Sequence, residues 1–189
     1  MANTLIDSVR FALASPRQVP DESSEPFAIA SIHRFENIFN EERLRLIVEL
    51  IQLAAKRCRL IFVLHPATKR KLKSSGLLAK LESDQNIRLS PRLSYLDFIS
   101  ILSRAEFVVT DGGGNQEELS YLGTPAFLMR AATERQEGVG RNIVLGGYSR
   151  DNMLNFLDSL SSLRSSSVLT GTNSPSQIIA DDLGAYASK

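Results

Sequence analysis

The sequence predicts an α/β fold built on a doubly wound parallel sheet of about six strands with helices on both faces. The first reason is a pattern: short apolar segments alternate with amphipathic ones from Pro26 to Met129, as in successive βαβ units. The second is length, because 189 residues can bury one large core but not two ordinary ones. The third is that polar residues follow several apolar segments, which is typical of parallel strands that end at a ligand site.

Residues 27–32 form the first expected strand. Asn40 then caps a helix that runs to about Lys56, in which apolar residues recur at the spacing of one helix face. The second strand is expected at residues 59–64. Two short helices, separated by a break at Ser74-Ser75-Gly76, and a short third strand complete this half, at residues 68–74, 77–82 and 87–89.

In the second half, Ser94 and Asp97 have the spacing of a capping box and open a helix to about Arg104. Residues 107–110 form the strand that delivers a glycine loop, and the helix after this loop ends near Leu122, with Gly123 as its C-cap. Two further strands are expected at residues 126–129 and 142–145, and a last pair of helices, split by a polar flexible loop, at residues 151–163 and 175–186. Before the first strand, we expect an amphipathic helix at residues 3–13 and a connector at residues 15–26.

Gly112, Gly113 and Gly114 stand between the fourth expected strand and its helix. Glycines let the backbone approach a ligand closely, and the N-terminus of the following helix favours an anion such as phosphate. Glu117 and Glu118 follow about 100° apart around that helix, so one of them can face the same ligand. The pattern indicates a nucleotide whose ribose hydroxyls donate to a carboxylate. The alternative is a glycine-rich turn that binds nothing.

Both histidines of the chain, His33 and His65, follow expected strands and should meet at the sheet edge that carries the glycine loop. His33 is the first candidate for ligand contact and the one candidate catalytic residue. His65 precedes a proline that fixes the turn, so it either contacts the ligand or holds the loop. Three arginines near strand ends are either diphosphate ligands or surface charges: Arg34, Arg130 and Arg135.

Composition excludes several function classes. The net charge of +1 argues against a nucleic-acid partner. The single cysteine, Cys58, forms neither an internal disulfide nor a thiolate metal cluster and fits a cytoplasmic setting. No apolar run reaches the ~20 residues that span a bilayer, so no membrane partner is expected. Two histidines from separate strands make a weak metal site, and Walker, dinucleotide and nucleophile-elbow patterns are lacking, so neither metal nor cofactor is expected.

Several motifs in order along the chain resemble one known family. They are His33-Arg34-Phe35-Glu36-Asn37, His65-Pro66, Tyr95 with Phe98, Asp111-Gly112-Gly113-Gly114-Asn115-Gln116-Glu117-Glu118, Leu122-Gly123-Thr124-Pro125, Met129-Arg130 and Thr133-Glu134-Arg135. They are similar to the motifs of the non-hydrolysing UDP-N-acetylglucosamine 2-epimerases, in the C-terminal half of their two-domain, glycosyltransferase-B-like fold. The resemblance spans most of the chain.

The resemblance implies a site for UDP or UDP-N-acetylglucosamine. It implies that the glycine loop and His33 hold the phosphates, that Glu118 holds the ribose and that the segment around Phe98 lies near the uracil. Arg34, His65 and Arg135 complete the expected set. The implied reaction is epimerisation at C2 of the sugar by elimination and re-addition of UDP. Its C2 acid and base belong to the family's N-terminal half, so the full-length protein is expected to be an isomerase and this chain alone to have no turnover.

Asn3-Thr4-Leu5-Ile6-Asp7 also resembles the family's interdomain segment. Residues 1–26 are therefore expected to form a hinge helix and connector, and residues 27–189 the nucleotide-sugar-binding domain with its C-terminal helices. The N-terminal domain is the expected partner, and a homodimer is left open. Phe35, Gly112 and Gln136 replace an arginine, a serine and a proline of the family pattern. These departures leave open another nucleotide sugar, a glycosyltransferase half-domain and a non-catalytic sensing or scaffold domain.

Overall fold

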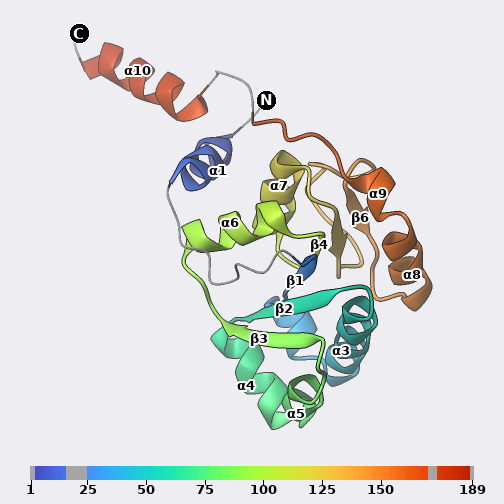
Figure 1. The fold of residues 1–189 in the computed structure, drawn as a ribbon. Helices are drawn as coiled ribbons and strands as arrows, with labels where there is room; N and C mark the ends of the chain where they lie inside the picture. Colours follow the sequence, from blue (N-terminus) through green and yellow to red (C-terminus); the bar gives the residue numbers. More distant parts are fainter. Residues whose placement is uncertain (1–2, 16–24, 170–173, 188–189) are drawn as a thin grey trace.

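The computed structural model describes residues 3–15, 25–169 and 174–187. In this part of the chain six parallel strands form one sheet in the order β3-β2-β1-β4-β5-β6 (Figure 1). The strands are β1 (Phe27–Ser31), β2 (Arg59–Leu64), β3 (Ile87–Pro91), β4 (Phe107–Thr110), β5 (Ala126–Leu128) and β6 (Ile143–Leu145). Helices cover both faces, so the predicted doubly wound α/β fold is confirmed.

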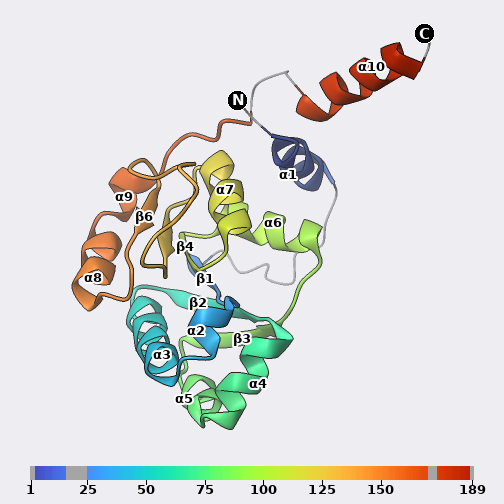
Figure 2. The same cartoon turned by 180° about the vertical axis from the view of Figure 1, so that it is seen from behind.

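Alternate residues of β1 show how the two faces are filled. Ala28 and Ala30 belong to one buried cluster, while Phe27 and Ile29 belong to the other. Because both faces are buried, the strand is apolar throughout, as expected in a parallel sheet. The first face carries α2 (Phe35–Ile38), α3 (Glu41–Ala55), α4 (Pro66–Ser74), α5 (Leu77–Glu82), α8 (Arg150–Asp158) and α9 (Leu160–Leu163), and the second carries α1 (Leu5–Ala14), α6 (Tyr95–Arg104) and α7 (Gly113–Leu122) (Figure 2).

Local capping chemistry sets several boundaries where the sequence predicts them. The Asn40 side chain accepts a hydrogen bond from Arg43 N at the start of α3, and the Ser94 hydroxyl accepts one from Asp97 N at the start of α6. Gly123 ends α7 with φ of 75°, a left-handed conformation that favours glycine. The bounds of β2, β4, α5 and α6 match the predicted ranges.

Other boundaries differ, for physical reasons. The helix expected from residue 68 begins at Pro66, because the His65 ring accepts a hydrogen bond from Ala67 N and acts as its N-cap. The single helix expected over residues 151–163 is divided into α8 and α9 at Ser159, whose N–H bonds to both Asn155 O and Phe156 O. Most of the expected connector, residues 16–24, lies outside the described part of the chain.

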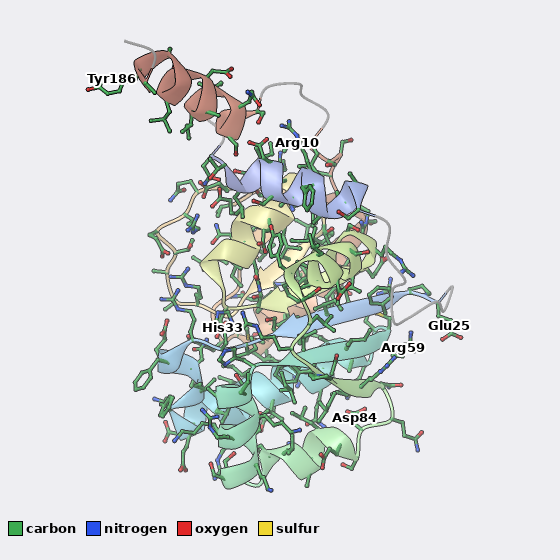
Figure 3. All side chains as sticks on the ribbon, turned by 90° about the vertical axis from the view of Figure 1, so that its left-hand side faces the viewer. Arg10, Glu25, His33, Arg59, Asp84 and Tyr186 are labelled. Atoms are coloured by element: carbon green, nitrogen blue, oxygen red, sulfur yellow. The ribbon has the colours of Figure 1, made fainter. Side chains whose placement is uncertain are left out.

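The first and last helices of the described chain, α1 and α10, differ in how they pack. Ile6, Val9 and Ala12 of α1 are buried in the cluster that includes α6 and α7. No residue of α10 (Pro175–Ala187) is buried. The helix lies beside α1 and away from the sheet (Figure 1), as the labelled Tyr186 of α10 and Arg10 of α1 also show (Figure 3). Asp7 links the two helices, because its Oδ2 accepts hydrogen bonds from Ser174 Oγ (3.0 Å) and Ser176 N (2.9 Å).

The strand order places a crevice between β1 and β4. The connection after β1 leads to β2 on one side, whereas the connection after β4 leads to β5 on the other. Two neighbouring strands whose connections leave in opposite directions open a crevice at their carboxyl ends, and such switch points are where doubly wound sheets bind ligands. The loop with His33 and the glycine loop therefore face each other at the carboxyl-end edge of the sheet.

Candidate functional site

A pocket of about 310 Å³ lies at this switch point, at the lower end of the range for small-molecule sites. Its walls come from the carboxyl ends of β1, β2 and β3, from the first turn of α6 and from the first two turns of α7. The lining residues are Ser31, His33, Val63, His65, Arg92, Leu93, Tyr95, Phe98, Asn115 and Glu118. Four of the residues predicted from the sequence thus line one cavity: His33, His65, Phe98 and Glu118.

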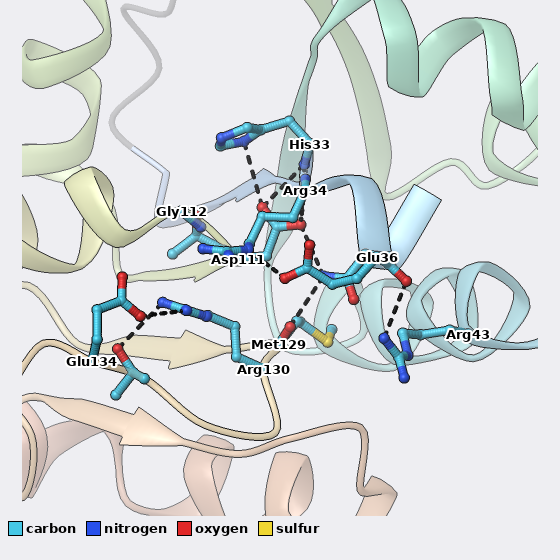
Figure 4. Close-up of polar contacts among 12 residues, drawn as sticks. His33, Arg34, Glu36, Arg43, Asp111, Gly112, Met129, Arg130 and Glu134 are labelled. Atoms are coloured by element: carbon cyan, nitrogen blue, oxygen red, sulfur yellow. Dashed lines mark hydrogen bonds and ion pairs between the residues drawn. The ribbon is translucent and has the colours of Figure 1, made fainter. Parts of the chain in front are cut away.

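Asp111, the first residue after β4, organises the pocket edge (Figure 4). Its carboxylate is fully buried and accepts hydrogen bonds from the backbone N–H groups of His33 (3.0 Å) and Arg34 (2.9 Å). Asn37 Nδ2 donates to Asp111 Oδ2 (2.9 Å) and also to Met129 O (3.1 Å). The hydroxyl of Tyr148 in turn donates to Asn37 Oδ1 (2.7 Å). This buried chain of bonds ties the ends of β1, β4 and β5 together.

The two histidines lie side by side, with ring centroids 6.1 Å apart. Nδ1 of His33 is 3.4 Å from Asp111 Oδ1, and its side chain is 42% exposed, so the ring can be reached by a ligand. Nδ1 of His65 is used internally, because it accepts from Ala67 N (3.3 Å). Burial lowers the pKa of His65, and the nearby His33, Arg92 and Arg70 lower it further, so the neutral form of this ring is favoured.

Glu117 and Glu118 point to different surroundings, as their helical separation requires. Glu117 is buried and pairs with Arg135, and it also accepts from the Tyr121 hydroxyl (2.8 Å) and from Asn3. Glu118 faces the pocket. Burial raises the pKa of the Glu118 carboxyl to about 7, a hydrogen bond from Tyr95 lowers it, and the charge of Glu117 raises it again. Glu118 is therefore the carboxylate available to a ligand.

The predicted arginines surround the glycine loop but do not line the pocket. Arg34 Nε bonds to Glu36 (2.5 Å), and Arg130 Nη2 bonds to Glu134 (2.6 Å). Arg135 pairs with Glu117 and packs on the glycine loop, since a Cβ at Gly113 would lie 3.0 Å from Arg135 Nε.

The glycines occupy three different settings at the start of α7. A Cβ at Gly112 would lie 3.0 Å from Cε1 of His33, so the missing side chain is what lets the imidazole approach the loop. Gly113 abuts Arg135, whereas a Cβ at Gly114 would meet no atom within 4 Å. The backbone at Gly114 is thus open to a ligand at the N-terminus of the helix.

Sequence reasoning missed several residues of this region as site candidates. Arg92 and Asn115 line the pocket, and the only available signals were the position of Arg92 just after a strand and that of Asn115 in the first turn of α7. Asp111 was passed over in favour of the glycines that follow it. A carboxylate directly after a buried strand was the signal for its role.

The described residues form neither a metal-binding cluster nor a helix that could span a membrane. Among residues 3–15, 25–169 and 174–187, no group of three or more His, Cys, Asp or Glu side chains is arranged to hold a metal ion. Within the same ranges, no helix has the length and apolar character needed to cross a bilayer.

Comparison with known proteins gives a consistent match. Residues 2–176 match a protein family described as UDP-N-acetylglucosamine 2-epimerase. The chain is 39% identical to the UDP-N-acetylglucosamine 2-epimerase of Methanocaldococcus jannaschii over 128 residues, which cover 65% of this chain and 34% of that enzyme. It is 33% identical to the UDP-2,3-diacetamido-2,3-dideoxy-D-glucuronate 2-epimerase of Pseudomonas aeruginosa over 139 residues, covering 72% of this chain and 38% of that enzyme.

The fold of the chain is also similar to that of the Methanocaldococcus jannaschii enzyme. The crystal structure of the Methanocaldococcus jannaschii enzyme in complex with UDP-GlcNAc and UDP superposes with a TM-score of 0.80 and 28% identity, covering 97% of this chain and 53% of that one. The chain therefore spans about half the length of that structure.

Proposed function

The chain belongs to the UDP-N-acetylglucosamine 2-epimerase family, and from this premise we propose that it is the UDP-binding half of a nucleotide-sugar 2-epimerase. The observation that carries the proposal is that His33 and Glu118 line one pocket at the N-terminus of α7. A helix N-terminus and an imidazole suit the phosphates. A buried carboxylate suits ribose, whose hydroxyls donate hydrogen bonds. The proposed domain division, with residues 1–26 as hinge and 27–189 as binding domain, follows from the same premise.

In the proposed pose the phosphates lie against the glycine loop and the two histidines. The uracil lies toward Phe98, whose neighbours in the wall include Val63 and Leu93, since an aromatic and aliphatic wall favours a flat base. The ribose between them reaches Glu118. Arg34 and Arg135 adjoin the loop, and we assign them to neutralising the diphosphate charge. This arrangement would use every residue of the predicted binding set.

The proposed reaction divides between the two halves of the whole protein. Removal of the C2 proton and cleavage of the C1–O bond release UDP and leave a glycal, and re-addition of UDP with proton delivery to the other face inverts C2. Negative charge develops on the departing phosphate, so His33 would act here by stabilising the leaving group. The acid and base at C2 would come from the other half. This chain alone would therefore bind without turnover.

The features of this site constrain the identity of the sugar less than that of the nucleotide. One relative, the Pseudomonas aeruginosa enzyme, is named for a diacetamido-glucuronate rather than N-acetylglucosamine. Phe35 is 71% exposed and stacks on Phe39, at a position where the family pattern has an arginine. The loss of that charge favours a different sugar, or a sensing domain, as the second candidate function.

An assay of the whole two-domain protein separates these functions. Incubated with UDP-N-acetylglucosamine and no acceptor, it is expected to form the C2 epimer, detected by NMR of the anomeric protons. A glycosyltransferase would convert the sugar only when an acceptor is added. A sensing domain would bind the nucleotide sugar and return it unchanged, which would refute the enzymatic part of the proposal.

Gly112 gives a direct test of the phosphate loop. We expect Gly112→Ser to raise the affinity for UDP about threefold to tenfold, because its hydroxyl adds one hydrogen bond to phosphate. The new Cβ would lie 3.0 Å from His33 Cε1, and the half-exposed ring can yield by a few tenths of an ångström. Isothermal titration measures the change. Gly112→Ala is the matched control, since it adds the Cβ without the hydroxyl and should not gain affinity; equal gains in both variants would contradict the account.

A further inference from the structure

The imidazole of His33 lies beside the buried carboxylate of Asp111. Asp111 Oδ2 already accepts from Arg34 N (2.9 Å) and Asn37 Nδ2 (2.9 Å). Asp111 Oδ1 lies 3.0 Å from His33 N and 3.4 Å from His33 Nδ1. The carboxylate therefore holds the backbone of the loop with both oxygens and still presents one oxygen to the imidazole (Figure 4).

An acceptor at this position selects the protonated form of Nδ1. An unprotonated Nδ1 would point its lone pair at the negatively charged oxygen of Asp111, and the two would repel. Nδ1 therefore carries a proton that points toward Asp111. Among the described residues, none donates to or accepts from Nε2 of His33. That nitrogen is the one left for a ligand in the pocket, and it donates to a phosphate only when it too carries a proton, that is, when the ring is an imidazolium.

His65 is held in the opposite way. Its Nδ1 accepts a hydrogen bond from Ala67 N (3.3 Å) at the start of α4, which requires a lone pair on Nδ1 and places the proton on Nε2. The neighbouring rings thus differ: His33 is protonated at Nδ1, and His65 is protonated at Nε2 alone. The lowered pKa of His65 agrees with a neutral ring.

We propose that Asp111 is a positioning residue that fixes the protonation and orientation of His33 for phosphate binding, while the α4 cap fixes His65 as a neutral Nε2–H donor beside it. The phosphate part rests on the proposed function, whereas the ring states do not. Asp111 need not touch the ligand, since it lies behind the imidazole and is fully buried. With phosphate bound, Nε2 of His33 would also carry a proton, so the pair would offer a diphosphate one cationic donor backed by the Asp111 carboxylate and one neutral donor, Nε2–H of His65.

The ring states are read directly by NMR, because the chain has two histidines and therefore two imidazole signals. In the protein labelled with 15N-histidine, we expect a protonated-type Nδ1 shift for His33, and unprotonated Nδ1 with protonated Nε2 for His65, without any ligand. His65→Gln assigns the signals. An unprotonated Nδ1 in His33 would overturn the proposal, whether or not UDP binds.

Asp111→Asn should remove the proton from Nδ1 of His33. The amide oxygen is needed where Arg34 N and Asn37 Nδ2 donate, and there it can still accept from His33 N, which lies 3.1 Å from Oδ2. The amide NH₂ then faces His33 Nδ1 and forces that nitrogen to accept. A ring that accepts at Nδ1 cannot be an imidazolium, so it offers phosphate only a neutral Nε2–H. We therefore expect the Nδ1 signal to become unprotonated and UDP affinity to fall about tenfold, while uridine, which lacks phosphate, changes less than twofold. Thr68→Val is the structural control: it removes the Thr68 hydrogen bond to Ile32 O at the same strand end and should leave the His33 ring signal as it is.

A double-mutant cycle tests whether Asp111 acts through His33. If it does, Asp111→Asn should cost about tenfold in UDP affinity in the native background and less than twofold in His33→Gln. Independent, multiplying losses would contradict the proposal. If Asp111→Asn does not fold, the ring states of the native protein still decide. If UDP does not bind the native protein at all, the proposed function fails instead, and the NMR result stands apart from it.

Discussion

Replacing Glu118 by glutamine is expected to weaken UDP binding and, above pH 7, to stabilise the fold. The pKa of this carboxyl is raised from 4.5 to about 7 by burial, so the folded protein keeps a proton that the unfolded chain releases. Stability therefore falls as pH rises from about 4.5 to 7, and the full cost, on the order of 3 kcal/mol, applies above pH 7. Glutamine resembles the neutral form and avoids that cost.

The same substitution removes the charge that ribose hydroxyls would bind. Loss of hydrogen bonds to a charged acceptor should weaken UDP binding by about 10-fold to 100-fold at pH 8. Thermal unfolding at pH 5 and pH 8 and isothermal titration at pH 8 measure the two effects. Glu117→Gln is the matched control, because it breaks the buried pair with Arg135 and should destabilise the fold at both pH values. Equal destabilisation by both variants at pH 8 would contradict the role of Glu118.

Replacing Gly146 by alanine should cause a large loss of stability. Gly146 follows β6, and a Cβ there would lie 1.9 Å from Cζ of Phe127. That ring is fully buried and packs on Phe156 (centroids 5.4 Å apart), which in turn packs on Phe107 (5.8 Å). A fully buried ring in these contacts can move only by displacing its neighbours, so overpacking should cost roughly 3 kcal/mol.

For a domain of this size the expected fall in melting temperature is roughly 6–12 °C. Gly114→Ala provides the control, since a Cβ at Gly114 meets no atom within 4 Å and should leave the melting temperature nearly unchanged. A Gly146→Ala protein as stable as the control would show that the β6 turn can shift away from Phe127. Circular dichroism melts of the two variants decide between these outcomes.

Much of the fold could be predicted because its signals are local. Asn40, Ser94 and Gly123 cap helices with their own side chain or backbone conformation, so the boundaries they set can be read within a few residues. The start of α4 was misplaced because a histidine ring serves as its cap, and histidine is not among the usual capping residues.

The site was harder to predict where it depends on contacts between distant segments. Helical geometry showed that only one of Glu117 and Glu118 could face the ligand. Which one does so is decided by Arg135, 18 residues further along the chain, and by Asn3, 114 residues before Glu117. The role of Asp111 likewise needs Asn37, 74 residues away. Such pairings exist only once the strands have been placed side by side.

The central claim is that the pocket beside His33 and Glu118 binds UDP, and isothermal titration of the folded chain with UDP, UDP-N-acetylglucosamine and ADP tests it most directly. The account predicts one saturable site that binds the uridine ligands at least about tenfold, or 1.4 kcal/mol, more tightly than ADP, with affinity reduced in both His33→Ala and Glu118→Ala. A chain shown to be folded by circular dichroism that gives no heat with UDP, or that binds ADP equally well, would contradict it.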